Sequence, residues 1–159
     1  MTAIRDGSHD FDFLVGRWRM HHRRLRERLK GSDSWEEFDG ESVGRMVLAG
    51  TASIDELTAE RETGHIEGFT LRLYNKEADE WSIYWAGLGA PQLDVPVVGR
   101  FVDGRGEFYS HEVWDGQHIF CRFIWCDITK DSAHWEQAFS IDGGKTWEKN
   151  WENDLYRIE

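Results

Sequence analysis

The side chains in this sequence that could perform metal or acid–base chemistry are its histidines and a few carboxylates. None of the seven histidines stands two positions from another, the spacing that would put two metal ligands on one face of a β-strand. His111 and His118 flank a short turn and could approach each other, but a zinc site needs further ligands, so we predict no metal. Glu112, Glu136 and Asp94 could act as general acids or bases if they point inward, although such carboxylates are more often solvated or ion-paired. The charged residues therefore identify no reaction.

Motifs for nucleophilic catalysis and for phosphate binding are absent from the sequence. It contains no Gly-x-Ser-x-Gly turn, no phosphate-cradling loop and no dinucleotide fingerprint, and Asp103–Gly106 is a turn signal. We therefore expect a protein that binds a ligand without catalysing a reaction.

Aromatic residues are abundant: they make up 14% of the chain and include nine tryptophans. The simplest role for them is core packing, because each aromatic side chain buries a large area. The functional alternative is a cavity whose aromatic walls and few polar groups hold a small apolar or aromatic molecule, including an acidic one. The candidate ligand-binding residues lie in aromatic-rich strands, where an unpaired polar atom would be costly: Tyr84, Trp85, Tyr109, His111, Arg122 and Glu136. Arg122 would pair with a ligand carboxylate or with Glu136.

The charge distribution argues against sequence-independent nucleic-acid binding. The formal net charge is −11, whereas such binding depends on clustered Lys and Arg. Residues 17–30 are the local exception, with seven of the 19 basic residues and a single Glu. They form either an anion-binding stripe or a hairpin in which they pair with the acidic residues of 36–41, and we favour the pairing.

Alternation of apolar and polar residues dominates the chain and predicts an all-β protein. The 159 residues suit one domain, residues 1–159, which can bury a sizeable core. A short capped helical turn is expected over 8–15, and the loop 88–96 contains both prolines. We predict about ten antiparallel strands in a sandwich or barrel: 17–29, 35–48, 51–58, 66–75, 80–87, 97–102, 106–114, 117–128, 134–141 and 146–157.

Some predicted strands are apolar on both faces. In Ile119–Cys126, neither set of alternating residues is polar enough to face water alone. Something must then cover the outer face, and we expect a homodimer through the sheet.

Two residues at opposite ends of the chain resemble the lipocalin and calycin pattern. Gly16-Arg-Trp18 opens the first predicted strand and Arg157 lies in the last. In that pattern a Trp packs against an Arg of the closing strand, a cation–π contact that closes the barrel. Three longer runs are similar to an uncharacterised bacterial family of lipocalin-like proteins: Phe11–Trp18, Leu71–Trp85 and Trp135–Trp147. The resemblance implies an antiparallel up-and-down calycin-type β-barrel closed by Trp18 and Arg157, and it implies no particular reaction.

Two further functions stay open on this fold. Calycin barrels of the nitrobindin type hold haem through one proximal histidine, and His22, His111 and His118 are the candidates here. The other alternative is an enzyme acting inside the barrel, an isomerase or decarboxylase, which would show an inward carboxylate or Tyr of shifted pKa beside a cavity.

Ser140–Trp147 matches the Asp-box of sialidase-like propellers, Ser-x-Asp-x-Gly-x-Thr-Trp. A propeller needs several blades, and this chain has one copy, so we predict only an Asp-capped hairpin with the Trp packed beneath it.

Location and redox state are expected to be those of the cytoplasm. The sequence has no signal-like apolar segment and no stretch long enough to span a membrane. Cys121 and Cys126 stand an odd number of positions apart, on opposite faces of one strand, so they cannot easily pair.

Overall fold

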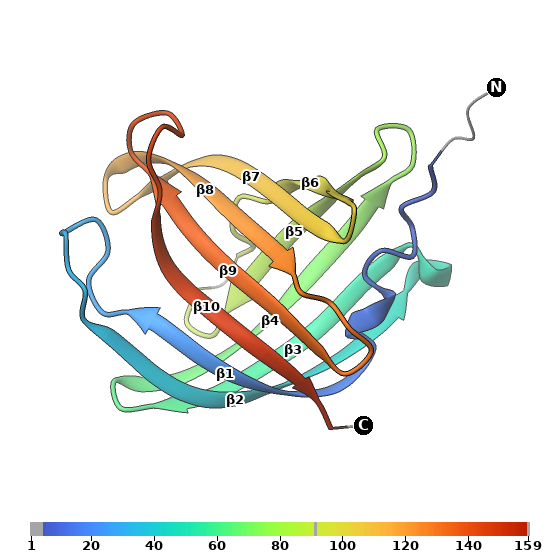
Figure 1. Cartoon of the computed structure of the whole chain (residues 1–159), viewed down its shortest axis with the longest axis horizontal. Coiled ribbons are helices and arrows are strands. Elements are labelled where there is room, and N and C mark those ends of the chain that lie inside the picture. The colour runs from blue at the N-terminus through green and yellow to red at the C-terminus, as the bar shows by residue number, and fades with distance from the viewer. Residues whose placement is uncertain (1–4, 91, 159) are drawn as a thin grey trace.

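The strands of this protein form one closed antiparallel barrel, as predicted (Figure 1). The computed structural model describes residues 5–90 and 92–158, so Pro91 of the predicted loop lies outside the described residues. Within that part of the chain, ten strands follow one another around the barrel: β1 (Gly16–Leu25), β2 (Trp35–Val47), β3 (Ala52–Arg61), β4 (Gly64–Asn75), β5 (Glu80–Gly87), β6 (Val97–Val102), β7 (Arg105–Trp114), β8 (Gln117–Cys126), β9 (Ser132–Ser140) and β10 (Glu148–Arg157). None of the helices in the described ranges has the length and apolar character needed to cross a membrane.

Tight turns make the connections local. Asp103 and Gly104 between β6 and β7 both have positive φ angles, 51° and 79°. Asp115 and Gly116 between β7 and β8 do the same, at 49° and 76°. Two consecutive residues of positive φ are what a two-residue hairpin turn requires, and Asp-Gly is a favoured pair for it.

The barrel closes where the first strand meets the last. Trp18 of β1 lies opposite Arg157 of β10, and the pairing continues to Arg24 and Trp151. The narrowest seam joins β5 to β6, where only Trp81–Ile83 pair with Val97–Gly99. Beyond Ile83 the β5 strand pairs with β4 alone. Within the barrel, neighbouring strands therefore share the fewest paired residues beside the β5–β6 loop.

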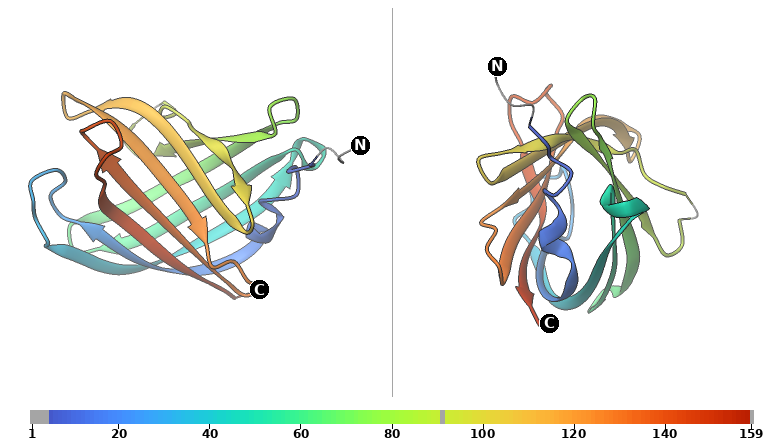
Figure 2. Two further views of the ribbon diagram at one scale, coloured as in Figure 1. Left: turned by 45° about the horizontal axis from the view of Figure 1, so that its top comes forward. Right: turned by 90° about the vertical axis from the view of Figure 1, so that its right-hand side faces the viewer.

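Aromatic side chains close one end of the barrel. A 3₁₀-helix, Asp12–Leu14, lies at this end, and no side chain caps it (Figure 2). Phe11, just before the helix, is completely buried and contacts the rings of Trp81, Phe101 and Phe108 at centroid distances of 5.0–5.8 Å. Trp81 also donates a hydrogen bond to the Gly7 carbonyl, which fixes the N-terminal segment across this end.

Trp18 and Arg157 are in contact at the same end. The Arg157 guanidinium lies 4.3 Å from the centroid of the Trp18 ring and donates to the carbonyls of Phe13, Val15 and Lys130. Trp18 has no exposed surface, and its indole N–H donates to the Leu14 carbonyl. The stacked pair thus joins the first strand, the last strand and the helix.

The basic first strand is largely neutralised by the second. Arg17 lies 3.6 Å from Glu41, and His21 binds both Asp39 and Glu37, at 2.9 and 3.1 Å. β1 ends at Leu25, earlier than expected, because the segment that follows turns back toward β2.

The outer face of the sheet retains exposed apolar residues, with Phe69, Leu73, Tyr109 and Phe120 each more than a third exposed. Homodimer formation through this face stays a prediction.

The Asp-box residues form the expected hairpin cap between β9 and β10. The Asp142 carboxylate accepts hydrogen bonds from the backbone and hydroxyl of Thr146 and from the Ser140 hydroxyl. These bonds lower the pKa of Asp142 to about 2. Trp147 packs on the outer face, with its ring 4.4 Å from the Arg122 guanidinium.

Candidate functional site

The cluster of Phe11, Trp81, Phe101 and Phe108 that closes one end of the barrel is called the aromatic plug. A cavity of about 100 Å³ lies inside the barrel, beyond this plug. Its walls are contributed by strands all around the barrel, together with the β5–β6 loop. The lining is mainly apolar and includes several polar groups: Leu14, Met20, Ser42, Asp55, Leu57, Thr70, Arg72, Ile83, Trp85, Asp94, Phe123, Trp125, Trp135, Gln137, Trp151, Asn153 and Leu155. We call this space the inner cavity.

A second cavity of about 180 Å³ adjoins the first, toward the end of the barrel opposite the plug. The two spaces share six lining residues: Ile83, Trp85, Asp94, Phe123, Gln137 and Trp151. We call the second space the mouth cavity, and its remaining lining is Arg24, Arg28, Val95, Val97, Glu112, Trp114, Cys121 and Phe139.

Tryptophan rings set the shape of the space where the two cavities meet. The Trp151 ring is nearly perpendicular to the rings of Trp85 and Trp135, with interplanar angles of 84° and 85°. Phe123 in turn meets Trp135 edge-on at 5.1 Å. Perpendicular rings present faces in different directions around one space, which suits a flat apolar molecule.

A buried ion pair between β3 and β4 lines the inner cavity. The Arg72 guanidinium lies 2.7 Å from the Asp55 carboxylate and donates to the Ser53 hydroxyl. Its charge also lies 4.9 Å from the centre of the Phe11 ring and 5.7 Å from that of Trp125. Arg72 therefore connects the cavity to the aromatic plug.

Two arginines stand in the mouth cavity and stack on aromatic rings. The Arg24 guanidinium lies 4.6 Å from the Trp151 ring centroid. The Arg28 guanidinium lies 5.3 Å from Phe139 and 5.9 Å from Trp114. Burial lowers the pKa of both groups, to about 10 for Arg28, and the positive charge of Arg24 adds to the effect on Arg28.

Two carboxyl groups, Asp94 and Glu112, also line the mouth cavity. Burial raises the pKa of each. For Glu112 the Asp94 charge adds to the rise, and a 2.7 Å hydrogen bond from the Ser110 hydroxyl opposes it. Inward carboxyls of raised pKa are the feature that the isomerase or decarboxylase alternative requires.

The raised pKa of Glu112 makes stability depend on pH. A carboxyl whose pKa is higher in the folded than in the unfolded protein destabilises the fold once it ionises. This cost is absent below the unfolded pKa near 4.5 and complete above the folded pKa. We therefore expect Glu112→Gln to melt at a higher temperature than the wild type at pH 8, with the difference disappearing as the pH falls toward 4.

Thermal melts across this pH range, followed by circular dichroism, measure the effect. Glu107→Gln is the matched control, because Glu107 lies on the same strand with its side chain exposed beside Arg105. A gain for Glu112→Gln that stayed constant from pH 4 to pH 8 would contradict the expectation.

Of the ligand-binding residues expected from the sequence, Trp85 lines the cavities. The others do not line either cavity, because they occupy the outward positions of strands whose alternate residues point in: Tyr84, Tyr109, His111, Arg122 and Glu136. Arg122, expected to meet a ligand carboxylate or Glu136, instead stacks on Trp147 outside the barrel.

The residues present do not fit a haem site. His22 is completely buried, but its Nδ1 accepts a hydrogen bond from the Trp151 indole, and its Nε2 faces Gly40 of β2. Burial lowers the pKa of His22 to about 4, so the ring is neutral. His111 and His118 lie 3.3 Å apart on the outside of the β7–β8 hairpin. None of the three lines the inner or the mouth cavity; His111 and His118 line a hollow on the outer face.

The cysteines lie on opposite faces of β8. Cys121 lines the mouth cavity, whereas Cys126 lies outside beside Asp127. Burial raises the pKa of both thiols, so neither is activated as a nucleophile.

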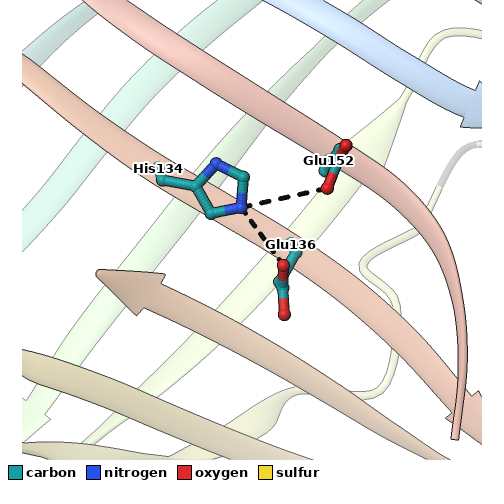
Figure 3. Close-up of side chains that lie close together, drawn as sticks. All are labelled: His134, Glu136 and Glu152. Carbon is teal, nitrogen blue, oxygen red and sulfur yellow. Dashed lines mark hydrogen bonds and ion pairs between the residues drawn. The ribbon is translucent and has the colours of Figure 1, made fainter. Parts of the chain in front are cut away.

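On the outer face, His134, Glu136 and Glu152 cluster closely enough to suggest a metal site (Figure 3). The His134 Nε2 lies 3.1 Å from Glu136 and 4.0 Å from Glu152. Glu152 is already bound by Arg23 at 2.6 Å and by Lys149 at 2.7 Å. Two cations at this carboxylate make the cluster an ion-pair network on the outer face.

Comparison with known proteins shows the fold. No family model and no curated protein matches the chain. Among solved structures, the chain is similar to the S-type phycobiliprotein lyase CPES from Guillardia theta, with 14% identity and a TM-score of 0.62 over 98% of this chain and 94% of the lyase. It also matches EF1p2_mFAP2b bound to DFHBI, with 10% identity and a TM-score of 0.48 over 96% and 99% of the two chains. The likeness to the lyase supports a lipocalin-like barrel.

Proposed function

We propose that the protein binds a small, flat, apolar or aromatic molecule in the two cavities, with its ring among Trp85, Trp135 and Trp151. The observation that carries this proposal is the enclosed space bounded by these perpendicular rings. A solidly packed core would leave no such space, because protein interiors are as dense as organic crystals.

The size of the space supports a ligand of one or two rings. An apolar cavity of about 150 Å³ is enough to hold benzene. The inner and mouth cavities, of about 100 and 180 Å³, adjoin and share the residues around their junction. A planar two-ring molecule could occupy both with modest side-chain movement.

Titration of the protein with 2-naphthamide, an uncharged two-ring compound, tests the proposal. We expect saturable binding by isothermal titration calorimetry, with quenching of tryptophan fluorescence. Trp85→Ala is expected to weaken this binding about tenfold, because it removes one aromatic wall without exposing a charge.

Trp147→Ala and Arg122→Ala are the matched controls, since both side chains stack on each other outside the barrel. Neither substitution should change the affinity. Absence of binding by the wild type, or equal weakening by Trp85→Ala and Trp147→Ala, would count against a ligand inside the barrel.

A further inference from the structure

The basic segment 17–30 divides into two groups by where its side chains point. Among the outward arginines, Arg17, Arg23 and Arg26 have carboxylate partners, as in Arg23 with Glu152 at 2.6 Å, whereas Arg19 stacks on Tyr156 outside the barrel. Arg24 and Arg28, in contrast, make no ion pair within 4.0 Å among the described residues, and they contact aromatic rings instead. These two charges are also the ones that line the mouth cavity.

The carboxylates nearest to this arginine pair are engaged elsewhere. Glu36 is buried and accepts hydrogen bonds from Thr63, at 3.1 Å, and from Arg61. Glu148 accepts the backbone N–H of Leu29 at 2.7 Å. Neither carboxylate forms an ion pair with Arg24 or Arg28 in the described part of the chain.

The carboxyl groups inside the mouth cavity do not neutralise the arginines either. The pKa of Asp94 is set by burial alone, and that of Glu112 by burial, Ser110 and Asp94. Among the described residues, neither carboxyl forms an ion pair within 4.0 Å with Arg24 or Arg28, although Arg28 stacks on Trp114, two positions from Glu112 on β7.

The Arg28 guanidinium lacks a hydrogen-bond acceptor at one nitrogen among the described residues. Its Nη2 atom is buried and has no hydrogen-bond partner. A buried guanidinium N–H without an acceptor is costly, and a buried charge without a counter-charge more so. An anion in the mouth cavity would relieve both costs.

The approach to the mouth cavity from solvent is basic as well. A surface hollow of about 620 Å³ shares Arg24, Arg28 and Trp114 with the mouth cavity. Its further charged lining is basic Arg26, Lys30 and Arg61 and acidic Glu27 and Glu36, so basic side chains are in excess. Concave basic sites focus the electrostatic potential and raise the local concentration of anions. On a chain of net charge −11, this hollow is a local exception.

We propose that Arg24 and Arg28 form a carboxylate-binding subsite, and that the ligand class of the barrel is therefore aromatic carboxylic acids. The planar guanidinium fork matches a carboxylate with two parallel hydrogen bonds. The ring of the acid would lie toward Trp85 and Trp151, and its carboxylate toward the two arginines. This inference rests on the proposed function, because it assigns the polar end of the same ligand.

Comparison of 2-naphthoate with 2-naphthamide tests the subsite, since the two compounds share size and shape and differ in charge. We expect the wild type to bind the acid about tenfold to a hundredfold more tightly at pH 8 and low ionic strength. Arg24→Gln and Arg28→Gln should each remove most of this preference, so that the variant binds the acid and the amide with similar affinity.

Arg19→Gln is the matched control: Arg19 lies on the same strand as Arg24, and its guanidinium stacks on Tyr156 outside the barrel at 5.9 Å. This substitution makes the same change in net charge and should preserve the preference for the acid. The wild-type comparison needs no variant, so the test stands even if an arginine variant does not fold.

Each pattern of results decides a separate point. Equal binding of acid and amide by the wild type, or equal effects of Arg19→Gln and Arg28→Gln, would overturn the subsite and leave the proposed function standing. Absence of binding by both compounds would overturn the proposed function and the subsite together.

Discussion

Replacing Trp18 by alanine is expected to lower the free energy of unfolding by about 3–5 kcal/mol, the range for a fully buried aromatic side chain. Trp18 has no exposed surface, and its indole N–H donates to the Leu14 carbonyl. The substitution would also remove the ring beneath the Arg157 guanidinium, which lies 4.3 Å from the ring centroid. The first and last strands would keep their backbone pairing and lose this side-chain contact at the closed end.

Urea unfolding followed by tryptophan fluorescence and circular dichroism measures this loss. Tyr156→Ala is the control: Tyr156 is 46% exposed and lies on the last strand beside Arg157. A change within about 1 kcal/mol is expected there. A loss below about 1 kcal/mol for Trp18→Ala would mean that the indole does not close the barrel.

Replacing Asp55 by alanine is expected to cost a similar amount, about 3–5 kcal/mol, because it breaks a buried ion pair from one side. The remaining Arg72 charge would stand between Phe11 and Trp125 with only the Ser53 hydroxyl as a polar partner. A buried unpaired charge is far less favourable than the pair or than an apolar replacement of both partners.

A double variant separates the loss of stability caused by the unpaired Arg72 charge from the loss caused by poorer packing. Asp55→Leu combined with Arg72→Met removes both charges, and it is expected to be more stable than Asp55→Ala by about 1–4 kcal/mol. Glu41→Ala, which breaks the exposed pair with Arg17, is the control and should cost less than about 1 kcal/mol. If the double variant were less stable than Asp55→Ala, the charge of Arg72 would not be the cause of the loss.

The strands could be predicted from the sequence because alternation and turn residues are local signals. The Asp-Gly turns at 103–104 and 115–116 have the positive φ angles expected of them. The end of the first strand was placed too late, since Arg26–Leu29 continue the polar pattern of the strand while the backbone turns; Leu29 has a positive φ of 60°.

The inward face of each strand could not be predicted, because alternation gives two faces and does not say which is inside. In β8, Ile119, Cys121 and Phe123 point inward, whereas Arg122 points outward, yet both sets contain aromatic residues. The sequence therefore predicts Arg122 as a cavity residue, and the structure places it on the outer face.

The polar groups inside the barrel were missed for the same reason. Between residues 69 and 73 of β4 the outward positions are apolar, with Phe69, Leu71 and Leu73, while the inward Thr70 and Arg72 line the cavity. A strand with its polar face inside is the opposite of the usual pattern for a filled core. Which face of β4 points inward depends on how several strands pair with one another, and the pattern within one strand does not determine that pairing.

A crystal structure of the protein soaked with 6-bromo-2-naphthoate, with the bromine located by anomalous scattering, tests the central claim most directly. The account predicts a bromine peak inside the barrel among Trp85, Trp135 and Trp151, with the carboxylate against Arg24 and Arg28. Bromine located on the outer face, for example beside Trp147, with the interior closed by side chains, would contradict it.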